Sequence, residues 1–355
     1  MRWLSDNRLA YLQSITDEPD FSSTKYRLIK ELARGGMGTV YLAEDTKLNR
    51  EVAIKVLSTP ELNSGLARRM VREAQIVARL EHPGIVPVHD VGVLEDGRVF
   101  YAMKFVRGSR LDECAVRADS IKDCLRKFQA VCDAVAFAHA HGVVHRDLKP
   151  QNIMIGSFGE VLVLDWGVAK LLPATRFGAE AETLPDRKPF PANPPEPNDD
   201  TAHGTIIGTP LYMSPEQARG EIGQLDERAD IFSLGTILYF LLTKQSPTIK
   251  KGSGVDDRPV AADSVLRPRE INPKASKAAE AICLKAMAYS PDQRYSSTAQ
   301  LSADIDKLLD GEPVSAYREN VFERLMRWLG KNRFLVLLVL AYLLMRIFFI
   351  LTSRR

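Results

Sequence analysis

Apolar and polar residues alternate in several early segments of the chain and recur at helical spacing through most of the rest. Alternation over residues 26–32 predicts a strand, and residues 86–93 and 98–105 predict two more strands joined by a Glu-Asp-Gly turn. Apolar residues repeat at helical intervals over 66–80 and 120–141 and predict two helices. Further elements are expected as a strand at 161–164, a buried helix at 230–241 and two helices within 276–309.

The N-terminal residues lie outside this pattern. Within residues 1–24, Leu4, Leu9, Leu12 and Ile15 fall roughly on one face of a helix. We interpret 1–24 as an extension that forms a loosely packed cap, in preference to a helix that docks a partner.

The C-terminal region combines basic residues with a long apolar run. Residues 311–333 interleave arginines and lysines with apolar residues that include Trp328, which predicts a basic amphipathic helix next to a membrane. Residues 334–351 are apolar except for Arg346, and this run approaches the roughly 20 residues that a membrane-spanning helix needs. We therefore expect a single-pass transmembrane helix at 334–351 in the cell membrane, with the preceding domain in the cytoplasm. A helix that lies in the interface or packs on a partner is the alternative.

Composition narrows the classes of function. The 355-residue chain is 45% apolar, so it can bury a sizeable core, and its net charge of +3 makes no case for binding nucleic acid. None of the four cysteines forms a C-x-x-C pair, which favours reduced thiols in a cytosolic domain. The N-terminus has no long apolar core and is not expected to be a secretory signal.

Polar side chains concentrate in one short loop at residues 145–152, which reads H-R-D-L-K-P-Q-N. Asp147 can accept a proton from a hydroxyl, Lys149 can hold a phosphate oxygen and Asn152 can hold a divalent metal. Arg146 can meet a nearby anion. This set suits phosphoryl transfer, in which catalysis is mostly positioning and charge stabilisation. An exposed polar turn after a helix is the alternative.

Three further motifs flank this loop, two before it and one after it. Residues 33–40 read A-R-G-G-M-G-T-V, and such a glycine-rich turn lets backbone N–H groups lie close to phosphates. The sequence V-A-I-K then ends in Lys55, a lysine within an apolar strand that needs an anionic partner. After the loop, the strand at 161–164 ends in Asp165, whose hard carboxylate oxygens suit Mg²⁺.

The motif H-R-D-L-x-x-x-N, with the other motifs in this order, resembles the eukaryotic-like protein kinase family, and the L-K-P-Q insert resembles its serine/threonine branch. The resemblance covers residues 25–310 and extends to membrane-anchored bacterial serine/threonine kinases. It implies an α+β, bilobal protein kinase fold. A small antiparallel sheet lobe is expected at 25–106 and a larger helical lobe at 107–310, followed by the C-terminal hydrophobic helix.

The resemblance also implies where the nucleotide binds. Lys55 would contact the α- and β-phosphates and pair with Glu73, for which Glu61 and Glu81 are the weaker candidates. Ala33 stands where the family has its first glycine. The expected nucleotide-binding residues are Ala33, Gly35, Gly36, Met37, Gly38, Val40, Ala53, Lys55, Met103, Lys104 and Val106.

The adenine is expected at the hinge between the lobes. The C=O of Lys104 and the N–H of Val106 would form its hydrogen bonds, and Met103 would line the back of the pocket.

Catalytic roles follow from the same resemblance. Asp147 would orient the hydroxyl and accept its proton, and Lys149 would steady the γ-phosphate. Asn152 and Asp165 would hold Mg²⁺, for which Mn²⁺ is a substitute. Trp166 stands where the family usually has Phe. The expected cofactors are therefore ATP and a divalent metal ion.

An unusual insert, about 172–203, lies where the family has its activation segment. It is rich in Pro, Glu, Asp and Ala and is interpreted as a disordered linker, with a partner-binding segment as the alternative. Thr205 is the first candidate for activating phosphorylation and Thr201 the second, because Arg146 could pair with the phosphate. Thr209 matches the family threonine that contacts the catalytic Asp and Lys.

Three other residues are expected to support the structure. Glu216 would pair with Arg294, and Asp230 would anchor the backbone of the 145–152 loop, which also holds Arg146.

We therefore expect a protein kinase that phosphorylates Ser and Thr hydroxyls of proteins and autophosphorylates in its activation segment. Pairing of membrane helices would bring two copies together for autophosphorylation in trans. A membrane-tethered pseudokinase and a small-molecule kinase are the alternatives. Ala33 and Trp166 support the former, whereas the G-T-P to S-P-E segment argues against the latter.

Overall fold

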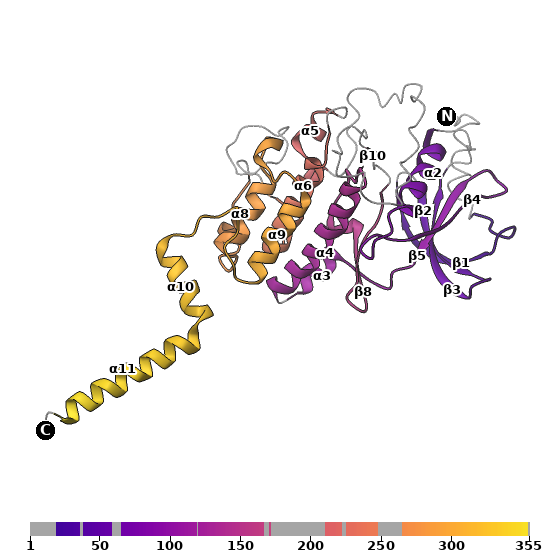
Figure 1. The fold of residues 1–355 in the computed structure, drawn as a ribbon. Helices are drawn as coiled ribbons and strands as arrows, with labels where there is room; N and C mark the ends of the chain where they lie inside the picture. The colour runs from indigo at the N-terminus through magenta and orange to yellow at the C-terminus, as the bar shows by residue number, and fades with distance from the viewer. Residues whose placement is uncertain are drawn as a thin grey trace, which may run out of the picture.

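The chain forms a lobe of antiparallel strands with one helix, followed by a larger lobe of helices (Figure 1). This is the bilobal α+β arrangement expected from the sequence. The computed structural model describes residues 19–35, 38–58, 65–118, 120–166, 170–171, 210–221, 225–247 and 265–353. Beyond residue 329, side chains are described for 332, 334 and 336–346.

The first lobe is built on a five-stranded antiparallel sheet with the strand order β1-β2-β3-β5-β4. Its strands are β1 (Tyr26–Arg34), β2 (Gly38–Asp45), β3 (Arg50–Leu57), β4 (Val88–Val93) and β5 (Val99–Lys104). Helix α2 (Gly65–Ala78) turns Ala67, Met70 and Ala74 toward this sheet, where they form a core with residues of β3 and β5. The helix is thereby fixed against the strand that carries Lys55.

Gly38 begins β2 because no larger residue fits there. A Cβ atom on Gly38 would lie 2.2 Å from the carbonyl oxygen of Val56 on the neighbouring strand. The N–H of Gly35 donates to the carbonyl oxygen of Gly38 (2.9 Å), so the two ends of the glycine-rich turn are held together. The close approach of β3 to β2 therefore explains why one position of the glycine-rich motif is Gly.

The second lobe packs its helices around α6, of which nearly every residue is buried. Gly235 allows α8 to approach α6 closely, since a Cβ there would lie 2.8 Å from the Ala286 Cβ. The helices of this lobe are α3 (Leu111–Arg117), α4 (Ile121–Ala140), α5 (Pro215–Ala218), α6 (Arg228–Thr243), α7 (Pro268–Ile271), α8 (Lys277–Ala286) and α9 (Thr298–Leu309), with 3-10 turns at Pro150–Asn152, Pro210–Tyr212 and Pro291–Gln293. All four cysteines are free.

Two small sheets lie between the helical core and the first lobe. One has the strand order β6-β8-β9 and the other pairs β7 with β10. Their strands are β6 (Gly108–Arg110), β7 (Val143–Val144), β8 (Ile153–Gly156), β9 (Val161–Val163) and β10 (Lys170–Leu171). Of these strands, the sequence predicted β9, within the apolar run at 161–164, and did not predict the other four.

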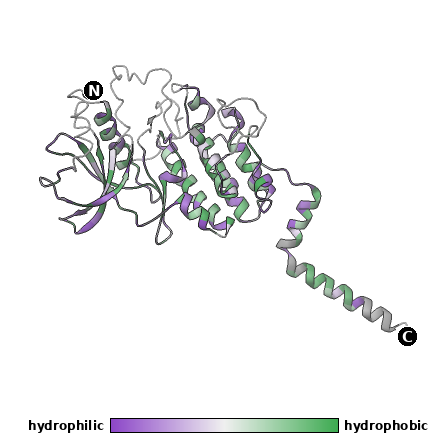
Figure 2. Ribbon diagram, turned by 180° about the vertical axis from the view of Figure 1, so that it is seen from behind, coloured by the Kyte–Doolittle hydropathy of each residue, from purple (hydrophilic) through white to green (hydrophobic). Residues whose placement is uncertain are grey.

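Helices α10 (Val321–Lys331) and α11 (Arg333–Ser353) extend away from the helical lobe (Figure 1). Hydrophobic residues predominate along the described part of α11, which lies outside the core (Figure 2). The helix predicted for 311–333 is shorter than expected, because Asn320 caps α10 and forms a capping box with Glu323.

The expected transmembrane helix at 334–351 is not supported. Within the described part of the chain, no helix has both the length and the apolar character that a membrane crossing requires. The extension at residues 1–18 and the insert at 172–203 lie outside the described residues, so the predictions made for them stay predictions.

Candidate active site

The predicted lysine, Lys55, lies in the middle of β3 and joins the two lobes. Its Nζ is 2.6 Å from Oδ1 of Asp165, which follows β9, and 3.4 Å from Oε1 of Glu73 on α2. Glu73 therefore occupies the position expected of it, whereas Glu61 lies outside the described residues and Glu81 follows the end of α2.

The pKa values of the two carboxylates that contact Lys55 shift in opposite directions. Burial would raise the pKa of Asp165, but the Lys55 ammonium outweighs this effect and holds the pKa below its usual value. Burial raises the pKa of Glu73, and Lys55 only partly offsets this increase. Asp165 is thus ready to act as an anionic ligand, and Glu73 depends on its partners to stay ionised.

The β8–β9 hairpin brings the 145–152 loop to Asp165. Asn152 directly precedes β8 and Asp165 follows β9, and the two strands pair in the register Ile153 to Val163. The N–H of Leu164 also donates to the carbonyl oxygen of Asn152 (2.8 Å). Two residues that are far apart in the motif order therefore lie at the same end of one hairpin.

Within the loop, hydrogen bonds centre on Asp147. Lys149 Nζ donates to Asp147 Oδ2 at 2.8 Å, and Asn152 Nδ2 donates to the Asp147 carbonyl oxygen at 2.9 Å and to Oδ2 at 3.2 Å. Because the amide nitrogen of Asn152 faces Asp147, its amide oxygen is the atom that remains for a metal ion. This oxygen and the Asp165 carboxylate are the hard donors that Mg²⁺ prefers.

These two donors would hold Mg²⁺ only in part. The described residues contain no group of three or more His, Cys, Asp or Glu side chains that could hold a metal ion. Mg²⁺ typically keeps few protein ligands and takes the remainder from phosphates and water. The donor set therefore fits a metal that arrives with a nucleotide.

The Asp230 carboxylate holds the backbone of the 145–152 loop in place. This carboxylate, which is fully buried, accepts the backbone N–H groups of His145 and Arg146 at 2.8 Å each, and the His139 Nε2 lies 2.8 Å away. Burial would raise the pKa of Asp230, but its hydrogen bonds to His139 and to the backbone of Arg146 hold the pKa below its usual value. The geometry agrees with the anchoring position predicted for Asp230.

Arg146 is held in an unusual backbone conformation. Its φ is +69°, in the left-handed region, and its carbonyl oxygen accepts a hydrogen bond from Gln217 Nε2 (2.8 Å). Nε and Nη2 of Arg146 are buried without a hydrogen-bond partner within the described part of the chain. Burial lowers the pKa of this guanidinium to about 10. Among the described residues, Arg146 therefore presents unsatisfied donors within the 145–152 loop.

Trp166 lies directly after Asp165 and is almost fully buried. Its ring packs at a tilt against that of His145 with centroids 4.6 Å apart, and its Nε1 donates to the carbonyl oxygen of Val163 (3.4 Å). The His145 Nε2 lies 3.0 Å from the Leu164 carbonyl oxygen. Trp166 thus fills an apolar site next to Asp165, as expected for the residue at this position.

The segment predicted to be the hinge follows β5. Ala53 pairs with Met103 across β3 and β5, and Lys104 donates its N–H to the carbonyl oxygen of Pro87 (3.0 Å). Val106 is buried just beyond the end of β5. Ala33 and Val40 pair across β1 and β2. Gly36 and Met37 lie outside the described residues.

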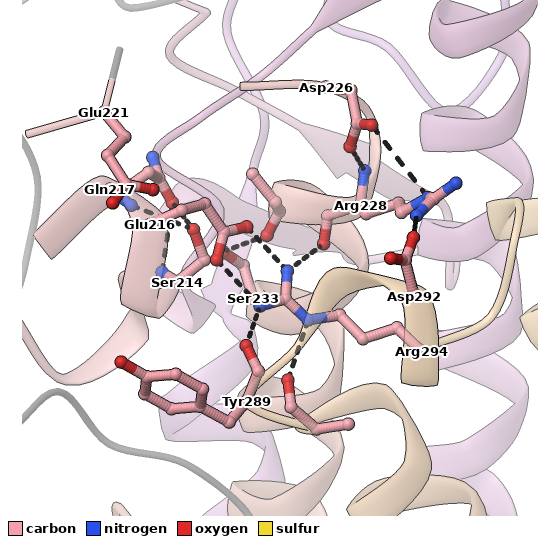
Figure 3. A network of polar contacts seen from close by, with 12 residues as sticks. Ser214, Glu216, Gln217, Glu221, Asp226, Arg228, Ser233, Tyr289, Asp292 and Arg294 are labelled. Carbon is pink, nitrogen blue, oxygen red and sulfur yellow. Dashed lines mark hydrogen bonds and ion pairs between the residues drawn. The ribbon is translucent and has the colours of Figure 1, made fainter. Parts of the chain in front are cut away.

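Glu216 and Arg294 form the predicted buried ion pair (Figure 3). Arg294 donates from Nη1 to Glu216 Oε1 at 2.7 Å and from Nη2 to Oε2 at 2.8 Å. Arg294 also donates to the carbonyl oxygens of Ala288, Arg228 and Tyr289. The pair therefore ties α5 to the turn that precedes α9. In α5, Glu216 directly precedes Gln217, which binds the 145–152 loop.

The sequence reasoning missed three contacts of the site. Tyr101 donates to Glu73, His139 binds Asp230, and Gln217 binds the backbone of Arg146. The first follows from the register of β3 and β5, which places Tyr101 opposite Lys55 and which the sequence did not predict.

The comparisons with known proteins agree with this geometry. A family model described as "Protein kinase domain" matches residues 26–304. The chain belongs to the protein kinase family. The chain is 35% identical over 304 residues to serine/threonine-protein kinase PknD of Protochlamydia amoebophila, covering 81% of its own length and 30% of that protein. It is 37% identical over 313 residues to PknD of Chlamydia muridarum, with coverages of 81% and 32%.

The chain thus spans about a third of the length of these curated relatives. The crystal structure of the Mycobacterium tuberculosis PknI kinase domain is also similar, with a TM-score of 0.57 and 24% identity over 80% of this chain and 96% of that one. At this identity the likeness concerns the fold.

Proposed function

We propose that the chain is an ATP-dependent serine/threonine protein kinase that transfers the γ-phosphoryl group of ATP to Ser and Thr hydroxyls of proteins. The observation that carries the proposal is the meeting of Lys55, Glu73 and Asp165 with the loop that holds Asp147 and Asn152. The names of the curated relatives support a protein acceptor bearing Ser or Thr.

Each residue of the site would have its own role in binding ATP or in phosphoryl transfer. Lys55, kept in place by Glu73, binds the α- and β-phosphates, and the backbone after β5 binds adenine. The Asp147 carboxylate takes the proton of the acceptor hydroxyl, while Lys149, 2.8 Å from that carboxylate, stays close enough to steady the γ-phosphate.

Asn152 and Asp165 would hold Mg²⁺, which neutralises charge on the phosphates, and Mn²⁺ is expected to substitute for it.

This assignment is favoured over a pseudokinase because every charged position of the site is present. Lys55, Glu73, Asp147 and Asp165 are all in place, and the departures at Ala33 and Trp166 leave their contacts intact. A pseudokinase would bind the nucleotide and transfer nothing. A small-molecule kinase would label a metabolite in place of a protein.

We further propose that phosphorylation of the segment at 201–209 activates the enzyme. Thr205, Thr201 and Thr209 lie outside the described residues, but Arg146 offers buried donors without a partner in the described part of the chain. A phosphate on this segment would satisfy those donors with charge-assisted hydrogen bonds.

Mass spectrometry after incubation with Mg-ATP tests this proposal. We expect phosphothreonine at Thr205, and an Arg146→Ala variant that is phosphorylated there without gaining activity. Absence of phosphate from 201–209 in an active wild-type enzyme would contradict the proposal.

We also propose that α10 and α11 attach the kinase to a membrane. Apolar side chains of α10 are exposed, with Phe322 at 68% and Trp328 at 51%, and the basic side chain of Arg324 on the same helix is exposed too. Such a helix suits an anionic lipid surface. We expect the full chain, but not a chain ending at residue 310, to sediment with anionic vesicles. Equal recovery of both in the supernatant would contradict the proposal.

A further inference from the structure

The hydroxyl of Tyr101 reaches the residue pair on which the proposed nucleotide site depends. Tyr101 on β5 lies directly opposite Lys55 on β3, so both side chains leave the same face of the sheet toward α2. Its Oη donates to Glu73 Oε1 at 2.8 Å, and both residues are buried, with exposed fractions of 4% and 5%.

Lys55 contacts the same two groups. Its Nζ lies 3.4 Å from the oxygen of Glu73 that accepts the Tyr101 hydroxyl, and 5.7 Å from the centre of the Tyr101 ring. Glu73 therefore has two partners on the sheet, and one of them is an uncharged donor. We infer that Tyr101 is a positioning residue that holds Glu73 toward Lys55 and so sets the affinity of the enzyme for ATP.

Movement of α2 away from the sheet would be costly for Tyr101. Its ring is packed among Leu57, Met70 and Ala74, so the hydroxyl cannot turn to water, and within the described residues Glu73 is its acceptor. If α2 moved away, a buried hydroxyl would be left without a partner. Tyr101 thus favours the arrangement in which Glu73 and Lys55 meet, which an apolar residue at this position would not do.

The charges around Glu73 explain why a neutral donor is useful here. Glu73 faces the ammonium of Lys55 on β3, the carboxylate of Asp165 after β9 and the hydroxyl of Tyr101 on β5. Burial and the nearby carboxylates raise the pKa of Tyr101 well above its usual value, so the hydroxyl keeps its proton and remains a donor. It steadies Glu73 without competing with Asp165 for the lysine.

The test compares Tyr101→Phe with a matched control. The substitution removes one oxygen and leaves the ring, and Tyr295→Phe removes another buried hydroxyl, which donates to Asp304 at 2.9 Å in the helical lobe. We expect Tyr101→Phe to raise KM for ATP and the Kd of Mg-ATP by about tenfold, the size of one lost hydrogen bond to a charged group. The value of kcat should change less, because saturating ATP restores the competent arrangement. Tyr295→Phe should leave both constants unchanged.

A double-mutant cycle separates positioning from a general loss of packing. In a Glu73→Ala background, Tyr101→Phe should have no further effect on the Kd of Mg-ATP. An unchanged Kd for Tyr101→Phe alone, or an equal loss in both backgrounds, would overturn the inference. The inference rests on the proposed function, but its failure is distinguishable. A wild-type enzyme that binds Mg-ATP and transfers no phosphate would contradict the function, and the binding cycle would still decide the role of Tyr101.

Discussion

Replacing Asp147 by Asn is expected to reduce kcat for phosphoryl transfer by roughly 100- to 10,000-fold, the usual contribution of a positioned general base. The amide keeps an oxygen that can accept the hydrogen bonds of Lys149 and Asn152, so the loop should retain its conformation. What the variant loses is the carboxylate that accepts the hydroxyl proton. Initial rates with labelled ATP and a protein acceptor measure the effect.

The control for this variant is Asp123→Asn. Asp123 is exposed in the first turn of α4 and pairs with Arg126 at the surface. The Asp123→Asn variant loses the same charge far from the site and should keep the full rate of phosphoryl transfer. The Kd of Mg-ATP should stay within a few-fold of wild type in both variants. An Asp147→Asn enzyme with the wild-type rate would contradict the assignment of Asp147 as the base.

The largest expected effect on stability comes from Arg294→Met. The Arg294 side chain is fully buried and Glu216 is 10% exposed, so the substitution leaves a buried carboxylate without its cation (Figure 3). Breaking one side of such a pair typically costs about 3–5 kcal/mol. Urea denaturation of the wild type and the variant gives the change in the free energy of unfolding.

Two companion variants sharpen this measurement. Arg219→Met removes a cation whose partner Glu221 is 41% exposed, and it should cost less than about 1 kcal/mol. Adding Glu216→Gln to Arg294→Met should recover part of the loss, because no charge then remains unpaired. A loss for Arg294→Met no larger than that for Arg219→Met would show that the buried pair does not stabilise the helical lobe.

The sequence predicted which motif residues meet at the site better than it predicted the residues that position them. Lys55, Asp147 and Asp165 each lie in a short motif whose residue types are tied to phosphate or metal binding, and the structure brings them together. The links from Tyr101 to Glu73 and from His139 to Asp230 join residues far apart in the chain. Nothing local marks such pairs before the strands and helices are placed.

Element boundaries failed for similar physical reasons. Strands β6 and β8 were not predicted, because the pairing that stabilises them joins segments far apart in the chain. Helix α10 begins later than predicted because hydrophobic spacing does not show where a helix starts. The Asn320-x-x-Glu323 capping box would have shown it.

The central claim is that the site moves phosphate from ATP to a protein hydroxyl. The most direct measurement is incubation of the full chain with ATP labelled in the γ-phosphate, followed by acid hydrolysis and separation of the phosphoamino acids. We predict label in phosphoserine or phosphothreonine that requires Mg²⁺ or Mn²⁺ and is lost in Asp147→Asn. Binding of Mg-ATP without any label in protein would contradict it.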